Sequence, residues 1–222
     1  LTKVMADQGL PDAIVAHAWL NRPNSAEVLA AQAAFAAVRG IRSKPRTSPT
    51  AASRGDVHGL SSSLQDPAWR KGLGQLRQHD LSWDLRVPFW HLAEAAEVCA
   101  LYPDLAIVTE HTGLAWDRSD EGLAEWRHGM TALAAMEHVH LKVSELGLAG
   151  APWDYNENRR LVREAIELFG FKRCMFASNF PVASLRIGYV EQVSAIAHMI
   201  SDCSCAERGA LFHDTAKRFY RL

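Results

Sequence analysis

Three cationic side chains have the positions needed to bind an anionic substrate. Arg42 and Arg86 follow apolar runs, and strand side chains alternate, so each guanidinium points away from its apolar neighbours. Two guanidinium groups at one site suit bidentate binding of a carboxylate, and the alternative is an ion pair with Asp84 or Glu145. Lys142 lies on the corresponding face of its own run, where it can polarise a carbonyl or pair with a carboxylate. The three cations are therefore candidate substrate-binding residues.

His111 ends a short apolar run and precedes Thr112-Gly113. A histidine at the end of a strand can bind a metal or contact the substrate, and the alternative is a buried imidazole bonded to a neighbouring strand. The pair His138-Val139-His140 would also share one strand face, but it begins its strand, roughly 15 Å from the other end at about 3.3 Å per residue. We therefore place His111 at the site, with Trp116 as a candidate rim residue, and exclude the pair.

Short β-rich runs alternate with longer amphipathic segments along the chain. The expected strands span residues 14–20, 38–42, 81–88, 106–113, 139–146 and 174–180. The expected helices span residues 25–35, 67–79, 91–102, 121–135, 157–169, 189–201 and 207–220. This alternation predicts βαβ units with right-handed crossovers and a parallel sheet.

The distribution of side chains over the strands indicates a barrel. One face of several strands is apolar, and the other is small, polar or charged toward the carboxyl end. A doubly wound open sheet, which is the alternative, would be apolar on both faces. Apolar residues facing outer helices and polar residues at the carboxyl ends are typical of a (β/α) barrel enzyme. The loops at residues 43–63 and 147–156 are either part of the site or plain connections.

Composition excludes several classes of protein. The 222 residues include 24 Lys+Arg and 25 Asp+Glu, a net charge of −1, so neither nucleic acid nor an anionic membrane is an expected partner. No apolar run is long enough to span a bilayer, and no secretory signal is visible. The four cysteines do not form a disulfide or zinc pattern. We expect a cytoplasmic protein with a small-molecule substrate, and a homo-oligomer stays open.

The first residues suggest that the front of a barrel is missing. The chain begins at Leu1 without an initiator Met, and residues 1–9 have the pattern of a helix that ends at Gly9. Six expected strands are two fewer than the eight of a closed barrel. We therefore expect residues 1–222 to be a single (β/α)8 TIM-barrel domain reduced to about six βα units.

Six sequence motifs, in this order, resemble the amidohydrolase-related TIM-barrel hydrolases, in particular the group with sugar lactonases and pyrone-dicarboxylate lactonase. They are VRGIR at 38–42, LSWDLRV at 81–87, IVTEHTG at 107–113, HLKVS at 140–144, RCMFASNFP at 173–181 and AKRFYRL at 216–222. The resemblance covers nearly the whole chain. It implies a hydrolase that acts on a small carboxylate-bearing lactone or related ester. The alternatives are a decarboxylase or lyase of the same superfamily, and a catalytically silent barrel that binds a small acid.

The resemblance also assigns site residues. His111 matches the sixth-strand histidine of the family, a catalytic residue and metal ligand, while the first-strand His-x-His has no counterpart in this chain. Asn179 stands where the family has the eighth-strand aspartate that activates water, and an amide cannot accept a proton at neutral pH. Glu145 is the nearest carboxylate that could replace this base. The resemblance implies a metal-assisted or metal-independent hydrolase, with Zn²⁺ or Mn²⁺ as the metal of a full-length protein. His111 and a neutral Asn179 are too few ligands for tight binding by this chain. If a base at this position activates water, Asn179→Asp should raise lactonase activity.

Overall fold

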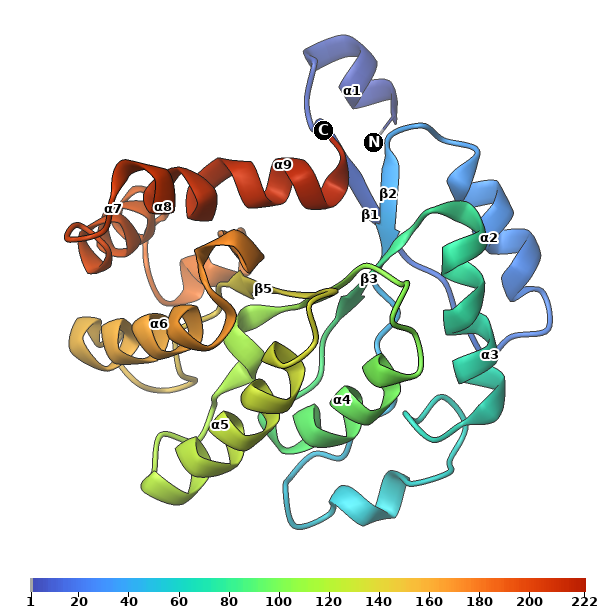
Figure 1. Ribbon diagram of the computed structural model, residues 1–222, viewed down its shortest axis with the longest axis horizontal. Helices are drawn as coiled ribbons and strands as arrows, with labels where there is room; N and C mark the ends of the chain where they lie inside the picture. The colour runs from blue at the N-terminus through green and yellow to red at the C-terminus, as the bar shows by residue number, and fades with distance from the viewer. Residues whose placement is uncertain (1) are drawn as a thin grey trace.

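The computed structural model describes residues 2–222 as a curled parallel sheet with helices around it (Figure 1). The strands are β1 (Ile14–Ala16), β2 (Val38–Ile41), β3 (Ser82–Leu85), β4 (Ile107–Thr109), β5 (Val139–Val143) and β6 (Cys174–Phe176). They lie side by side in chain order, and every neighbouring pair is parallel. This half-barrel matches a truncated (β/α)8 TIM barrel and confirms the predicted fold class.

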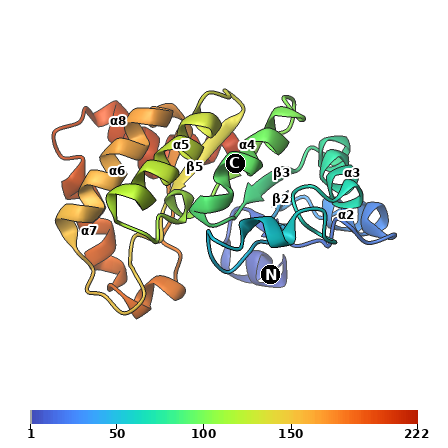
Figure 2. The ribbon, with the colours of Figure 1, turned by 90° about the horizontal axis from the view of Figure 1, so that it is seen from below.

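Most of the helices lie along the outside of the curled sheet (Figures 1 and 2). The helices are α1 (Thr2–Gln8), α2 (Ser25–Ala33), α3 (Pro67–Gln75), α4 (Leu92–Ala100), α5 (Asp120–Ala134), α6 (Tyr155–Phe169), α7 (Tyr189–Met199), α8 (Cys205–Gly209) and α9 (Thr215–Tyr220). Asp66 caps α3 by accepting a hydrogen bond from the Ala68 N–H, and Gly170 ends α6 with φ 74°. None of the described helices is long and apolar enough to cross a bilayer.

The expected helices are all present, but the strands are shorter than expected. The strand expected at residues 81–88 ends at Leu85, and a short 3-10 turn, Phe89–His91, leads into α4. The strand expected at residues 106–113 ends at Thr109 because the backbone then turns at His111–Leu114. The helix expected at residues 207–220 is divided by a π-helical turn, Ala210–Asp214. The residues that follow the ends of these strands therefore lie outside the hydrogen-bonded sheet, and the candidate site includes several of them.

The alternation of strand side chains is confirmed. Trp83 and Leu85 of β3 and Leu141 of β5 are fully buried in the main hydrophobic core, on the side that the helices cover. Asp84 and Lys142 leave the same strands on the opposite side and pair with each other. The sheet therefore separates an apolar outer layer from a polar interior.

The C-terminal helix α9 contributes to the interior of the half-barrel. Phe219 and Tyr220 form a small second core with Val108 of β4 and Met175 of β6, and Val15 of β1 packs against it. Strands that are not neighbours in the sheet are connected through these two aromatic rings. The end of α9 therefore carries a side chain to the polar residues of the central strands.

Candidate active site

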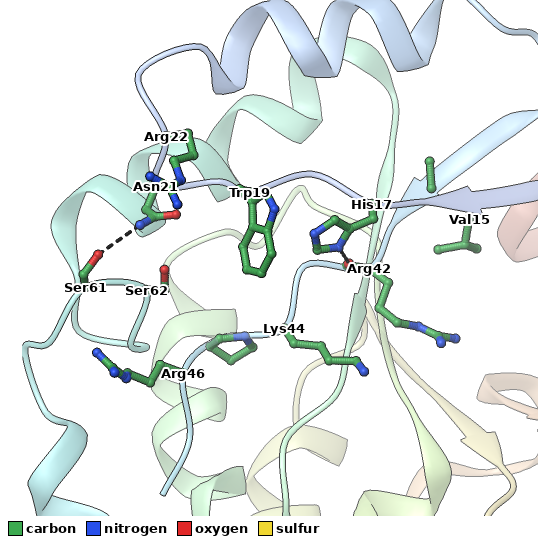
Figure 3. A pocket seen from close by; sticks show the side chains of 12 residues that line it. Val15, His17, Trp19, Asn21, Arg22, Arg42, Lys44, Arg46, Ser61 and Ser62 are labelled. Atoms are coloured by element: carbon green, nitrogen blue, oxygen red, sulfur yellow. Dashed lines mark hydrogen bonds between the residues drawn. The ribbon is translucent and has the colours of Figure 1, made fainter. Parts of the chain in front are cut away.

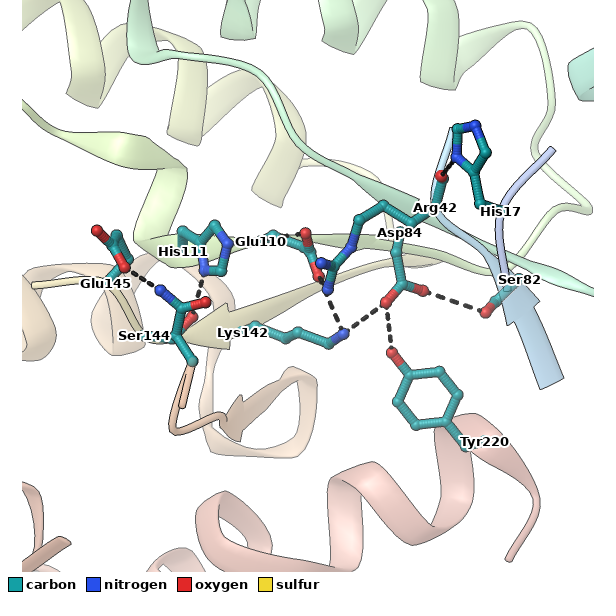
Figure 4. Close-up of polar contacts among 11 residues, drawn as sticks. His17, Arg42, Ser82, Asp84, Glu110, His111, Lys142, Ser144, Glu145 and Tyr220 are labelled. Atoms are coloured by element: carbon teal, nitrogen blue, oxygen red, sulfur yellow. Dashed lines mark hydrogen bonds and ion pairs between the residues drawn. The ribbon is translucent and has the colours of Figure 1, made fainter. Parts of the chain in front are cut away.

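Two buried carboxylates hold the cations of the central strands (Figure 4). Lys142 Nζ lies 2.5 Å from Asp84 Oδ2 and 3.3 Å from Glu110 Oε1, and both carboxylate side chains are fully buried. Arg42 also pairs with Glu110 Oε1, at the end of β4. The ion-pair alternative is thus realised for both cations, although the partner of Arg42 is Glu110 and not Asp84 or Glu145. We call Asp84, Glu110, Arg42, Lys142 and Tyr220 the charge network.

Tyr220 completes the charge network from the C-terminal helix. Its hydroxyl donates a hydrogen bond of 3.0 Å to Asp84 Oδ2, the oxygen that also contacts Lys142. Burial raises the pKa of Asp84 above its ordinary value, while Lys142 and Tyr220 oppose this shift by stabilising the carboxylate. Burial also raises the pKa of Tyr220, and the Asp84 charge adds to this effect, so Tyr220 stays a donor.

His111 lies at the centre of a cationic environment at the carboxyl end of β4. Burial lowers its pKa to about 3, and the positive charges of Arg86, Arg42 and Lys142 contribute in the same direction. The imidazole is therefore neutral at physiological pH. Its Nδ1 lies 3.0 Å from Ser144 Oγ on the neighbouring strand end, and its Nε2 lies 3.9 Å from Glu110 Oε2.

Arg86 follows β3 and is half-buried. Arg42 pairs with Glu110, whereas no ion pair among residues 2–222 includes Arg86. Lys44, beyond β2, lies close enough that burial and then the charges of Arg86 and Arg42 lower its pKa. Arg86 is therefore a cation near His111 whose charge is not neutralised by an ion pair in the described part of the chain.

Glu145 and Asn179 meet between the ends of β5 and β6. The Asn179 side-chain amide donates a hydrogen bond to Glu145 Oε2. Glu145 directly follows Ser144, the residue whose hydroxyl contacts His111 Nδ1. All three catalytic candidates therefore gather at the carboxyl ends of β4, β5 and β6.

A cavity lies to one side of this group, over the ends of β1 and β2 (Figure 3). Its volume is about 890 Å³, and its lining includes the cationic or titratable side chains His17, Arg22, Arg42, Lys44 and Arg46. Arg42 is the residue that this cavity shares with the predicted site. Glu145 lines a separate small cavity with Trp153. Trp116 is 41% exposed and packs against Trp90, with ring centroids 5.8 Å apart.

Sequence reasoning missed Glu110, Tyr220 and Ser144 as contributors to the site. Strand alternation would put Glu110 and His111 on opposite faces, but His111 has φ 61° and leaves the extended conformation. Both side chains can therefore face the interior. The Thr112-Gly113 sequence after the strand was the available signal for this turn, whereas no local pattern indicated that Tyr220 contacts Asp84.

The metal assignment of His111 stays a prediction. Zinc takes three or four protein ligands in most sites, and residues 2–222 contain no cluster of three His, Cys, Asp or Glu side chains arranged for a metal. The carboxylate beside His111 Nε2 belongs to Glu110, which already pairs with Arg42 and Lys142. These side chains do not by themselves fit a metal ion, and we derive no step through one.

Comparisons with known proteins agree with this architecture. A family model described as amidohydrolase matches residues 4–222. An uncharacterised protein, y4mH, of Sinorhizobium fredii is 35% identical over all of this chain and 74% of its own length. An L-fucono-1,5-lactonase of Burkholderia multivorans is 31% identical over all of this chain and 84% of its own length. A crystal structure of a Burkholderia multivorans amidohydrolase with bound zinc, 28% identical, gives a TM-score of 0.84 and covers 100% of this chain and 77% of that one. The chain therefore belongs to the amidohydrolase family.

Proposed function

We propose that this protein hydrolyses a small carboxylate-bearing lactone or a related ester. The observation that carries the proposal is the position of His111, a neutral imidazole, near Arg86, whose guanidinium has no carboxylate partner within residues 2–222, at the carboxyl ends of parallel strands. A carboxylate on the substrate is attracted to such an environment, and Arg86 offers a guanidinium that is not engaged by a carboxylate within residues 2–222. The similarity to an L-fucono-1,5-lactonase supports a lactone as the reacting group.

In the proposed reaction, His111 acts on the carbonyl of the lactone. A neutral imidazole can donate one N–H to the carbonyl oxygen, where negative charge develops as water attacks. The pKa of about 3 means that His111 remains neutral throughout the physiological range, so its hydrogen bonding does not change with pH there. Arg86 binds the substrate carboxylate and orients the carbonyl toward His111.

Glu145 takes the role of the base in this proposal. Its Oε2 accepts the Asn179 amide, whereas no hydrogen bond reaches Oε1 from the described residues. Oε1 can accept a proton from water while the water oxygen bonds to the carbonyl carbon. The ring C–O bond then breaks, the leaving oxygen takes the proton back from Glu145, and the product is a hydroxy acid. Asn179 orients the carboxylate and does not accept the proton.

The test is an assay of the purified protein against a panel of sugar lactones and carboxylated lactones, with ring opening followed by acid release. We expect Glu145→Gln and His111→Gln to lose about 10²–10⁴-fold in kcat, the usual contribution of such groups. The matched control is Glu97→Gln on α4, because Glu97 is exposed and lies outside the site. Full activity in both site variants, with ring opening by the wild type, would contradict the assignment.

One observation favours a second candidate, a decarboxylase or other lyase. Asn179 occupies the position where the family resemblance places a water-activating carboxylate, and a lyase does not need to activate water. The same panel therefore includes aromatic and aliphatic acids, with CO₂ release as the readout. Release of CO₂ without lactone opening would replace the hydrolase proposal, and tight binding without turnover would indicate a silent barrel.

A further inference from the structure

The backbone that carries His111 turns in the left-handed sense over four consecutive residues. The φ angles are 61° at His111, 50° at Thr112, 67° at Gly113 and 48° at Leu114. Side chains other than glycine avoid this region, and a β-branched threonine is disfavoured there in particular. Such a turn persists only where surrounding contacts determine it. We therefore expect the contacts that stabilise this turn to determine the orientation of the His111 imidazole, which lies at its start.

The side chain of Thr112 holds this turn against the end of β5. Its Oγ1–H donates to the Ser144 carbonyl at 2.9 Å, and its Oγ1 accepts the Ser144 N–H at 3.1 Å. Both residues are 1% exposed, so water does not compete for these bonds. The Trp126 indole N–H donates to the Thr112 carbonyl at 2.9 Å and fixes the turn from α5.

Ser144, whose backbone Thr112 binds, also contacts the imidazole of His111. Ser144 Oγ lies 3.0 Å from His111 Nδ1, and Figure 4 shows the serine next to the ring. On the other side of the ring, Nε2 lies 3.9 Å from Glu110 Oε2. That oxygen is buried and has no hydrogen-bond partner among the described residues, while the other oxygen of the carboxylate binds Arg42 and Lys142.

This arrangement distinguishes the two neutral forms of His111. With the proton on Nδ1, the Nε2 lone pair would face the negative Glu110 Oε2, which is repulsive. With the proton on Nε2, a positive N–H faces that oxygen, and the Ser144 hydroxyl donates to the Nδ1 lone pair. The surroundings of the ring therefore favour the form that carries its proton on Nε2.

We propose that Ser144 and Thr112 are positioning residues that fix the direction and tautomer of His111. Ser144 donates to the Nδ1 lone pair and holds the ring so that its Nε2–H faces Glu110 Oε2, and Thr112 fixes Ser144 through two hydrogen bonds to its backbone. The assignment of the tautomer stands on these contacts, and its consequence for catalysis rests on the proposed function of His111. Outer residues of this kind typically change activity about 10–100-fold when they are removed.

The experiment compares four variants of the purified full chain. Ser144→Ala removes the donor to Nδ1, Thr112→Val removes both threonine bonds at constant shape, and Thr112→Ser restores the hydroxyl. Thr109→Val is the matched control, because the buried Thr109 Oγ1 has no hydrogen-bond partner among residues 2–222. Side-chain ¹⁵N spectra of labelled histidine report the tautomer of His111, whose signals are identified by their loss in His111→Gln.

We expect the wild type, Thr112→Ser and Thr109→Val to show a protonated Nε2 and an unprotonated Nδ1. Ser144→Ala and Thr112→Val should show a shifted Nδ1 signal, because Nδ1 loses a well-placed donor, and kcat should fall about 10–100-fold with KM nearly constant. A protonated Nδ1 in the wild type would overturn the proposal, as would wild-type signals in Ser144→Ala. If Thr112→Val does not fold, Ser144→Ala decides the matter alone. The spectra do not depend on turnover, so an inactive wild type with the expected spectra would count against the proposed function and support the tautomer assignment.

Discussion

The side-chain amide of Asn179 donates a hydrogen bond to the Glu145 carboxylate, and both residues have a left-handed backbone, with φ 53° and 50°. The two residues follow neighbouring strands, β6 and β5, whose ends bring them together. The amide supplies an N–H donor to one carboxylate oxygen of Glu145. A carboxylate at position 179 would not supply this donor and would bring a second acid against Glu145.

The first prediction concerns Asn179→Asp. The family resemblance predicts a gain in lactonase activity for this variant. The contact with Glu145 leads us to predict no gain, because the variant would place two carboxyl groups in contact and raise the pKa of one of them. A carboxyl pKa raised in the folded state removes stability as the pH rises through that range, so the loss should grow from about pH 4 to pH 7. We expect the free energy of unfolding at pH 7, measured with urea, to be lower than that of the wild type by about 1–3 kcal/mol. We expect no gain in the rate of lactone ring opening.

The exposed Asn156 gives the control, since Asn156→Asp adds the same charge at the surface, in the first turn of α6, and should not lower the free energy of unfolding. A stable Asn179→Asp variant with raised lactonase activity would show that the family's aspartate mechanism is intact in this chain.

The second prediction concerns the hydrogen bond between α9 and the charge network. Tyr220→Phe removes the hydroxyl that donates to buried Asp84 and leaves the ring packed against Val108 and Met175. Hydrogen bonds to charged groups contribute about 1.5–3 kcal/mol, so the free energy of unfolding should fall by about that amount. The control Tyr189→Phe changes a 53% exposed tyrosine, and equal stability of both variants would argue against the contact.

The third prediction uses the depressed pKa of His111. The folded pKa of about 3 lies below the ordinary value of 6.5, so between these values the unfolded chain binds a proton that the folded chain does not. The contribution of His111 to the free energy of unfolding should therefore be fully present above about pH 6.5. It should fall as the pH decreases, by up to about 1.4 kcal/mol per pH unit.

The measurement is the difference between wild type and His111→Gln in urea unfolding from pH 7 to pH 4. This difference cancels the effect of other groups, including His140, whose pKa burial lowers to about 4. The exposed His128 provides the control, because His128→Gln should keep the wild-type pH dependence. A constant difference across the range would refute the burial of a neutral His111.

The fourth prediction tests the close approach of β2 and β3 inside the half-barrel. A Cβ atom at Gly40 would lie 2.2 Å from Ser82 Oγ and 3.2 Å from the Ser82 carbonyl oxygen. Gly40→Ala should therefore destabilise the fold by about 1–3 kcal/mol, as overpacking does, and Ser82→Ala in the same chain should recover part of the loss. Gly55→Ala is the control, since a Cβ there meets no atom within 4 Å.

The sequence by itself determined where most helices and strands lie and which faces the strand side chains occupy. Apolar alternation placed Trp83 and Leu85 toward the helices and Asp84 and Lys142 toward the interior, and the structure confirms each placement. Such patterns depend on residues only a few positions apart, as does the Asp66 cap of α3. Local interactions of this kind can be predicted without knowing how the sheet curls.

Only the tertiary structure decided which groups the interior residues meet. Arg42 pairs with Glu110, 68 residues away, and Tyr220 reaches Asp84 across 136 residues. These pairs depend on the curvature of the sheet and on the path of α9, which no local pattern specifies. The left-handed turn at His111 also interrupts the alternation that sequence reasoning relies on, so Glu110 and His111 both reach the interior. A site built at strand ends is decided by long-range contacts, because the regular hydrogen-bond ladder that makes side-chain direction predictable stops there.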